Sequence, residues 1–156
     1  MKNEIKISEI IKLIRVRSLK DHEGFLYQLL KKRKANYSIS HSELPTLKNH
    51  KKFISKNPYR YWFIIELQEK FVGSAYISKN NSIAIHLMEE RKKIYEEVLL
   101  FFNKNIKPLK EIPSIRSREF IINLSINNKF YANIIKKLGG KKIQETYCLK
   151  NEKKQH

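Results

Sequence analysis

The stretch that decides the fold reads NNKFYANIIKKLGGKK and spans residues 127–142. Its apolar residues recur every three or four positions, as on one face of an amphipathic helix, and the pair Gly139-Gly140 follows at once. Glycine readily adopts the left-handed backbone conformation that ends many helices. β-prone segments lie before the stretch, at 119–124, and after it, at 142–149. The sequence therefore predicts a strand–helix–strand unit over 119–149, closed at Leu138-Gly139-Gly140.

The remaining chain divides into segments with similar patterns. Residues 60–67, 71–78 and 82–87 are rich in aromatic and β-branched side chains and are separated by short turns, which predicts a three-stranded antiparallel meander. Helical spacing predicts helices over 21–34 and 89–105. Thr46 is suited to cap a further short helix that ends before Pro58. Residues 13–19 alternate as a strand does, and 35–45 look irregular.

These elements follow one another in the order β-α-α-β-β-β-α-β-α-β. A meander followed by two strand–helix crossovers predicts an α/β (α+β) fold with a mixed sheet of about six strands and helices on both faces. The chain has 156 residues, which is the usual size of one domain. We therefore expect a single domain over 1–150 and a polar tail over 151–156.

The net charge of +18 is carried by 26 lysines and 7 arginines spread along the whole chain. Arginine reads phosphates and base edges better than lysine does. No local arginine-rich stripe is interleaved with aromatic residues, as a nucleic-acid site would favour. The charge therefore indicates biased composition and a solvated surface, and a basic nucleic-acid-binding module is the weaker alternative.

Other functional classes receive little support from the sequence. No apolar run is long enough to span a bilayer, and the first residues lack the pattern of a secretory signal. Cys148 is the single cysteine and has no internal partner for a disulfide, which favours a reducing, cytoplasmic setting. The five histidines lack zinc-ligand spacing, so no metal site is expected.

The element order and the segment 127–142 together resemble the GCN5-related N-acetyltransferase (GNAT) superfamily. Members often carry an asparagine at the start of this helix and Lys-Leu-Gly at its end. The resemblance implies the GNAT fold, an acetyl- or other acyl-coenzyme A co-substrate, and transfer of the acyl group to a primary amine. The segment 39–62 is similar to members that act on amino-sugar intermediates, which implies a small-molecule acceptor such as an amino sugar or nucleotide sugar. An exposed edge rich in aromatic residues could support a homodimer.

The resemblance also implies where coenzyme A binds. Its pantetheine arm is expected to pair with backbone groups of strand 82–87, where that strand splays from strand 119–124. Its pyrophosphate is expected at the start of helix 89–105. The expected contact residues are Ile85, Leu87, Arg91, Lys92, Lys93 and Asn128. Purely structural explanations are also open: Arg91, Lys92 and Lys93 as solvated cations at a helix start, and Asn128 as a helix cap.

Three side chains are candidates for the chemistry. His86 lies on the strand that would face the acceptor amine, and a histidine with a near-neutral pKa suits a base. Glu66 is a second candidate base. Tyr131 lies one helical turn before the family's usual tyrosine acid, whose position Ile135 occupies here. The structural alternatives are a half-buried histidine satisfied by a neighbour and a core tyrosine.

His41 and Glu43 are candidate substrate contacts, because they lie in the segment that shapes the acceptor pocket in the resembling family. A polar loop explains these two residues equally well.

The segment 91–96 departs from the family's pyrophosphate loop. Arg91 is in place, but Ile94 and Glu96 stand where the family has small residues. Glycine lets the backbone approach phosphates closely, whereas Ile94 adds bulk and Glu96 adds negative charge. With Ile135 in the tyrosine position, these departures support an alternative: a GNAT-like fold that has lost catalysis and binds a ligand or partner.

Overall fold

The computed structural model describes residues 2–33 and 43–149. Within these residues the elements run β1 Glu4–Lys6, β2 Ile11–Arg15, α1 Lys20–Lys32, α2 Leu47–Lys56, β3 Tyr61–Leu67, β4 Lys70–Ile77, β5 Ser82–Leu87, α3 Lys92–Asn105, β6 Ile121–Ile122 and α4 Lys129–Lys137. The strands form one sheet in the order β1-β2-β3-β4-β5-β6. Neighbours from β1 to β5 are antiparallel, and β5 and β6 are parallel. The predicted mixed sheet is confirmed.

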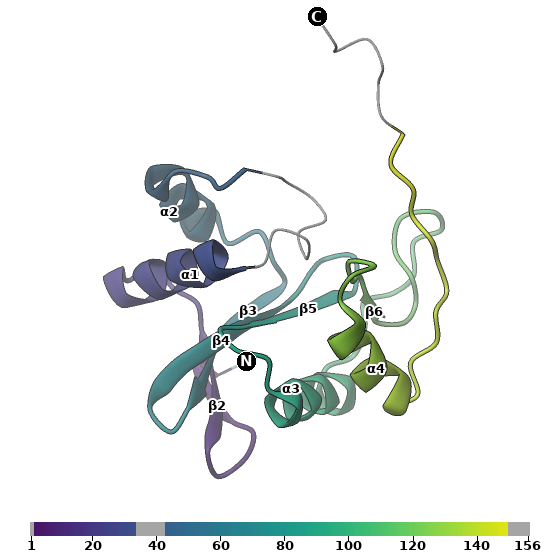
Figure 1. Cartoon of the computed structure of the whole chain (residues 1–156), viewed down its shortest axis with the longest axis horizontal. Coiled ribbons are helices and arrows are strands. Elements are labelled where there is room, and N and C mark those ends of the chain that lie inside the picture. Colours follow the sequence, from purple (N-terminus) through teal and green to yellow (C-terminus); the bar gives the residue numbers. More distant parts are fainter. Residues whose placement is uncertain (1, 34–42, 150–156) are drawn as a thin grey trace, which may run out of the picture.

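Helices cover both faces of the sheet, with α1 and α2 on one side and α3 and α4 on the other (Figure 1). Alternation along β3 explains the two layers, because successive strand residues point to opposite faces. Phe63 and Ile65 join the core under α3, and Trp62 and Ile64 join a smaller cluster on the α1/α2 side. A continuous apolar run such as β3 fits a strand that is covered on both faces.

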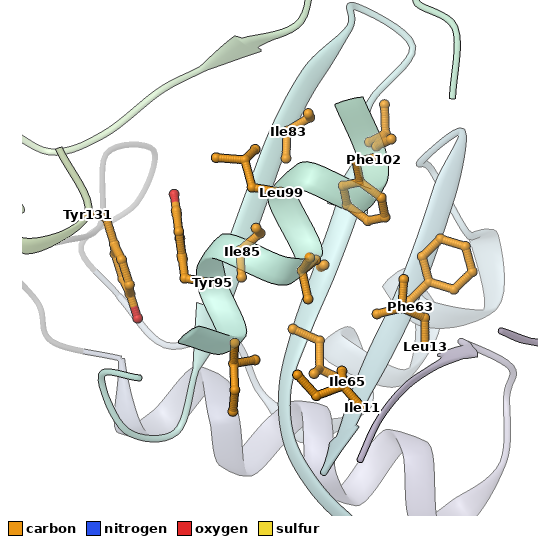
Figure 2. Packing of buried hydrophobic residues seen from close by; sticks show 14 of the residues in the cluster. Ile11, Leu13, Phe63, Ile65, Ile83, Ile85, Tyr95, Leu99, Phe102 and Tyr131 are labelled. Carbon is orange, nitrogen blue, oxygen red and sulfur yellow. The ribbon is translucent and has the colours of Figure 1, made fainter. Parts of the chain in front are cut away.

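The core under α3 is the larger of the two. Tyr95, Val98 and Phe102 project from one side of α3 and are buried, in contact with side chains of β2, β3 and β5 (Figure 2). The Phe63 and Phe102 rings lie 6.1 Å apart between centroids. This packing fixes the start of α3 against the end of β5.

Local signals set several boundaries as predicted. The Thr46 side chain accepts a hydrogen bond from the Asn49 N–H at 3.2 Å and caps α2. Gly139 has φ +89° just after α4, and the Gly140 N–H donates to the Ile135 carbonyl at 2.9 Å. A Cβ atom at Gly140 would lie 2.4 Å from Ile135 Cγ2. Leu138-Gly139-Gly140 therefore ends the helix, and the second glycine has no room for a side chain.

The two ends of the sheet differ from the prediction. Strand β1 was not predicted, since it has three residues and only its middle side chain is half-buried. The expected strand 119–124 shortens to Ile121–Ile122, and the expected final strand over 142–149 is wrong. Those residues are exposed and join no strand, and the yellow segment in Figure 1 runs past α4 without joining the sheet. A two-residue β6 offers little edge for a further strand to extend.

Asn81 anchors the loop between α3 and β6. Its fully buried side chain donates to the carbonyls of Leu109 and Ser117 and accepts from the Leu109 N–H, each at 2.8 Å. Its own carbonyl accepts from the Ile121 N–H at 3.0 Å. Asn81 therefore fixes where β6 joins the sheet. Residues 151–156, the predicted tail, lie outside the described residues, and none of the described helices has the length and apolarity to cross a membrane.

Candidate active site

Strands β5 and β6 pair over only two residue pairs. The register joins Ser82 to Ile121 and Ile83 to Ile122, and no pair follows. Beyond this point the strands separate around a cleft of about 290 Å³. The cleft is lined by Leu29 and Lys32 of α1 and its C-cap residue Arg33, by 84–90, by Tyr95 of α3, by 122–125, and by Asn128 and Tyr131.

The backbone groups that face this cleft follow from the hydrogen bonds on the other side of β5. The Ser78 N–H donates to the Ser82 carbonyl and the Met88 N–H donates to the Val72 carbonyl, so the even-numbered residues of β5 bond to β4. The odd-numbered residues therefore turn their N–H and C=O groups toward β6. Past Ile83 these are the groups of Ile85 and Leu87, at positions where the register gives β6 no partner.

Helix α3 begins directly beyond the cleft. Arg91 is its N-cap residue and makes no side-chain capping bond, and the first N–H groups of any helix have no intrahelical acceptor. The Ile94 side chain is 4% exposed and packs into the core under α3. It also lines a second cleft together with Glu89 and Arg91, so part of its bulk lies beside the start of the helix.

Each cation of this region has a carboxylate partner. Arg91 NH2 lies 3.2 Å from Glu89 Oε2, and Lys92 and Lys93 form i,i+4 pairs with Glu96 and Glu97 at 3.5 and 3.8 Å. The cations are about half exposed or more, and exposed pairs of this kind are weak. An incoming phosphate can therefore compete for Arg91, Lys92 and Lys93.

His86 lines the cleft from β5, on the face covered by α1 and α2. It stands opposite Ser74 in the β4 register, and its ring lies 6.1 Å from that of Tyr76. Burial and, to a smaller extent, the positive charge of Arg33 together lower the pKa of the His86 imidazole to about 3. The expected near-neutral pKa is therefore wrong, and His86 is a neutral hydrogen-bonding group.

Tyr131 and Asn128 reach the cleft from the other side of the sheet. The Asn128 side chain accepts from the Tyr131 N–H at 3.3 Å and caps α4, so its helix-cap role is confirmed. The Tyr131 ring stacks on Tyr95 with centroids 4.0 Å apart and an interplanar angle of 13°. The two hydroxyl groups lie at opposite ends of the stack (Figure 2). Burial, followed by the neighbouring Tyr131, raises the pKa of the Tyr95 hydroxyl.

Two predicted residues are not brought to the cleft. Glu66 lies on β3 and forms an ion pair with Lys12 of β2 at 3.3 Å. The carboxylate that was predicted as a candidate base therefore pairs with a lysine of the neighbouring strand. Glu43 is exposed and is not among the residues that line the cleft. His41 lies outside the described residues.

The cleft also holds residues that the sequence did not single out. Arg33 ends α1 and is half-buried, and Tyr95 is 1% exposed at the start of α3. Arg33 belongs to a basic run from residue 31 to 34, in which nothing distinguishes it from its neighbours. Tyr95 lies in the segment 89–105 that was predicted to be helical, but its stacking on Tyr131 depends on how α4 packs beside α3.

Comparison with known proteins adds evidence on the fold. No family model and no curated protein matches the sequence. The solved structure of the microcin C7 self-immunity acetyltransferase MccE, in complex with acetyl-CoA and AMP, is similar with a TM-score of 0.63 and 16% identity, over 89% of this chain and 83% of that chain. The acetyltransferase from Salmonella typhimurium that modifies the N-terminal serine of a 50S ribosomal subunit protein is similar with a TM-score of 0.61 and 18% identity, over 86% and 82%. These likenesses confirm the predicted fold.

Proposed function

We propose that this chain, which has the fold of the GCN5-related N-acetyltransferases, moves an acetyl or other acyl group from acyl-coenzyme A to a primary amine of a small molecule. The observation that carries the proposal is the opening of the sheet after Ile83, where the N–H and C=O groups of Ile85 and Leu87 face the cleft. An extended ligand with amide groups satisfies such an edge in the way an added strand would.

The parts of coenzyme A fit the cleft in sequence. Its pantetheine arm is a narrow chain with two amide groups, which suits the backbone of Ile85 and Leu87. Its pyrophosphate then reaches the uncapped start of α3, where helix N–H groups and the dipole favour anions. Arg91 and Lys92, which are about half exposed, exchange their carboxylate partners Glu89 and Glu96 for phosphate oxygens.

The chemistry follows from the two sides of the cleft. The acceptor amine attacks the thioester carbonyl carbon, so that a C–N bond forms while the C–S bond breaks, and positioning supplies much of the rate. His86, with its low pKa, accepts a hydrogen bond from the neutral amine and leaves the proton to solvent. Tyr131, on the opposite side of the cleft, donates a proton to the departing sulfur.

The similar structures support the reaction class and leave the acceptor open. MccE was solved with acetyl-CoA, and the ribosomal enzyme acetylates a protein N-terminus. We assign the small-molecule acceptor to this chain because segment 39–62 is similar to members of the resembling family that act on amino-sugar intermediates. A peptide with a free N-terminal serine is therefore the acceptor to test against small amines.

Calorimetry with acetyl-CoA tests the cofactor part of the proposal. Wild-type protein should bind with a micromolar Kd, and Ala84→Leu, which adds bulk inside the cleft, should weaken binding at least tenfold. Ala132→Leu adds the same bulk to a half-buried alanine of α4 outside the cleft lining and should bind as wild type does. Absence of heat from wild-type protein at millimolar acetyl-CoA would contradict the proposal.

Turnover separates an enzyme from a binding protein. Release of free thiol in the presence of an amine panel should be faster than acetyl-CoA hydrolysis alone. Tyr131→Phe should lower kcat by more than tenfold with little change in the Kd for acetyl-CoA. Tight binding without turnover of any amine would favour the second candidate, a GNAT-like binding protein, which Ile135 in the usual tyrosine position supports.

A further inference from the structure

The α1 side of the cleft has a different character from the α4 side. Toward α4 the lining consists of the stacked rings of Tyr95 and Tyr131 and of Asn128, which caps α4. Toward α1 it carries two cations, Lys32 and Arg33, beside the neutral His86. The side that would receive the acceptor therefore carries positive charge.

Arg33 is placed where this charge acts inside the cleft. It is the C-cap residue of α1, and its backbone N–H donates to the Leu30 carbonyl. Leu29, one turn of chain before it, is 7% exposed and also lines the cleft. The Arg33 side chain is half-buried and its Nε atom is buried, and the residue lines the cleft together with His86.

The charge of Arg33 is felt on two groups of this face. After burial, it is the second cause that lowers the pKa of His86. Burial raises the pKa of the Tyr59 hydroxyl, and Arg33 partly opposes that rise; the Tyr59 ring stacks on Tyr76 with centroids 3.8 Å apart. The carboxylates of the cleft lining, Glu89 and Glu90, are exposed, and Glu89 is paired with Arg91. Lys32 and Arg33 thus place positive charge beside His86 on this side of the cleft.

A positive field has two consequences for an amine acceptor. It disfavours the ammonium form, so a substrate whose only charges are positive binds poorly. It also rewards a negative group on the same molecule, which guanidinium binds through paired N–H donors. Both effects select an acceptor that presents a neutral amine to His86 and an anionic group to Arg33.

We propose that Arg33 is a specificity-determining residue and that the acceptor is an anion-bearing amine, with a carboxylate or phosphate group that pairs with Arg33 while its amine lies at His86. This inference rests on the proposed acyltransferase function and narrows its substrate class. Simple alkylamines and polyamines are poor acceptors on this account.

The test compares matched amines that differ in one charged group. The carboxylate arm uses β-alanine against β-alaninamide, and the phosphate arm uses 2-aminoethyl phosphate against ethanolamine. Binding is followed through the NMR signals of the His86 imidazole, with acetyl-CoA binding measured separately by calorimetry. In wild-type protein the anion-bearing member of at least one pair should bind about 10- to 100-fold more tightly than the partner whose only charge is its ammonium group, and the arm that responds identifies the anion.

Variants assign the preference to Arg33. Arg33→Gln should abolish the difference within the responding pair, because it weakens binding of the anion-bearing member and does not weaken binding of its partner, and Arg33→Lys should keep part of the difference. Lys31→Gln removes the same charge from the same helix at an exposed lysine that lies over the Tyr27 ring and should keep the full preference. Arg33→Glu should favour spermidine over both anionic amines.

The outcomes separate this inference from the function on which it rests. Equal affinities within both wild-type pairs, no binding of either anionic amine, or equal weakening of both members by Arg33→Gln would overturn the inference even if acetyl-CoA binds. Failure of acetyl-CoA to bind, with the anion preference intact, would overturn the acyltransferase proposal and leave Arg33 as an anion site.

Discussion

The two faces of the sheet differ in what they bury. The face under α3 and α4 holds the large apolar core that contains Leu13, Phe63 and Phe102. The face under α1 and α2 holds a smaller cluster around Trp62 and Ile64, together with each histidine in the described residues and with Arg33. The face under α3 and α4 therefore mainly stabilises the fold, whereas the face under α1 and α2 carries the polar groups that surround the acceptor side of the cleft.

Neighbouring isoleucines of β3 test this difference most strongly. Ile64 and Ile65 are both 0% exposed and point to opposite faces. Ile65→Ala should lower the free energy of unfolding by about 4 kcal/mol, and Ile64→Ala by about 2–3 kcal/mol, because the smaller cluster collapses more easily around a cavity. Urea denaturation measures both, and an equal or reversed order would break the comparison.

The second prediction concerns Asn81, at the edge where the α3–β6 loop joins the sheet. Asn81→Ala should lower the free energy of unfolding by about 2–3 kcal/mol, since it removes three hydrogen bonds of a fully buried side chain at a residue with φ 60°. Asn81→Gly keeps the backbone conformation and loses the same bonds, so it should cost less than alanine. If urea denaturation gives both variants the same free energy of unfolding as wild-type protein, Asn81 does not fix the position of β6.

The third prediction uses pH, because the titratable histidines lie on one face. Burial lowers the pKa of His22, His50 and His86 in the folded protein, so below the ordinary value of 6.5 the unfolded chain binds more protons. The free energy of unfolding should therefore fall as pH drops from 7 to 5. His50→Gln should make the free energy of unfolding depend less steeply on pH, and an unchanged dependence in that variant would show that His50 does not contribute to it.

The smallest effect is expected at the exposed start of α3. Glu96→Gln breaks the pair with Lys92 and should change the free energy of unfolding by less than about 0.5 kcal/mol. It should tighten acetyl-CoA binding two- to threefold, since Lys92 then meets phosphate without a competing carboxylate. Glu97→Gln, which frees Lys93 one position further along, is the comparison variant, and a weaker Kd in Glu96→Gln would contradict this role.

Much of the fold could be predicted because its signals are local. The meander over β3, β4 and β5 follows from β-branched and aromatic runs, and Thr46, Asn128 and Gly139 mark helix ends through their own backbone bonds. The strands at the two ends of the sheet could not be predicted in the same way. Their length depends on whether a neighbouring edge is available, which is a property of the tertiary structure.

The site was predictable in part for the same reason. The cleft-facing positions of Ile85 and Leu87 could be predicted because alternate residues of a strand face the same way, and the position of Arg91 could be predicted because the sequence indicates the start of a helix there. Glu66 could not be excluded from sequence, because its partner Lys12 lies 54 positions away in the chain and meets it only through the β2–β3 register. Arg33 and the low pKa of His86 likewise depend on packing between α1 and β5.

The central claim is that the cleft-facing backbone of β5 binds an extended amide ligand, and amide hydrogen exchange tests it most directly. The N–H groups of Ile85 and Leu87 face the opening, while those of Ala84 and His86 already bond to β4. Saturating acetyl-CoA should slow exchange at Ile85 and Leu87 at least tenfold and leave Ala84 and His86 nearly unchanged. Unchanged exchange at Ile85 and Leu87 under saturation would contradict the account.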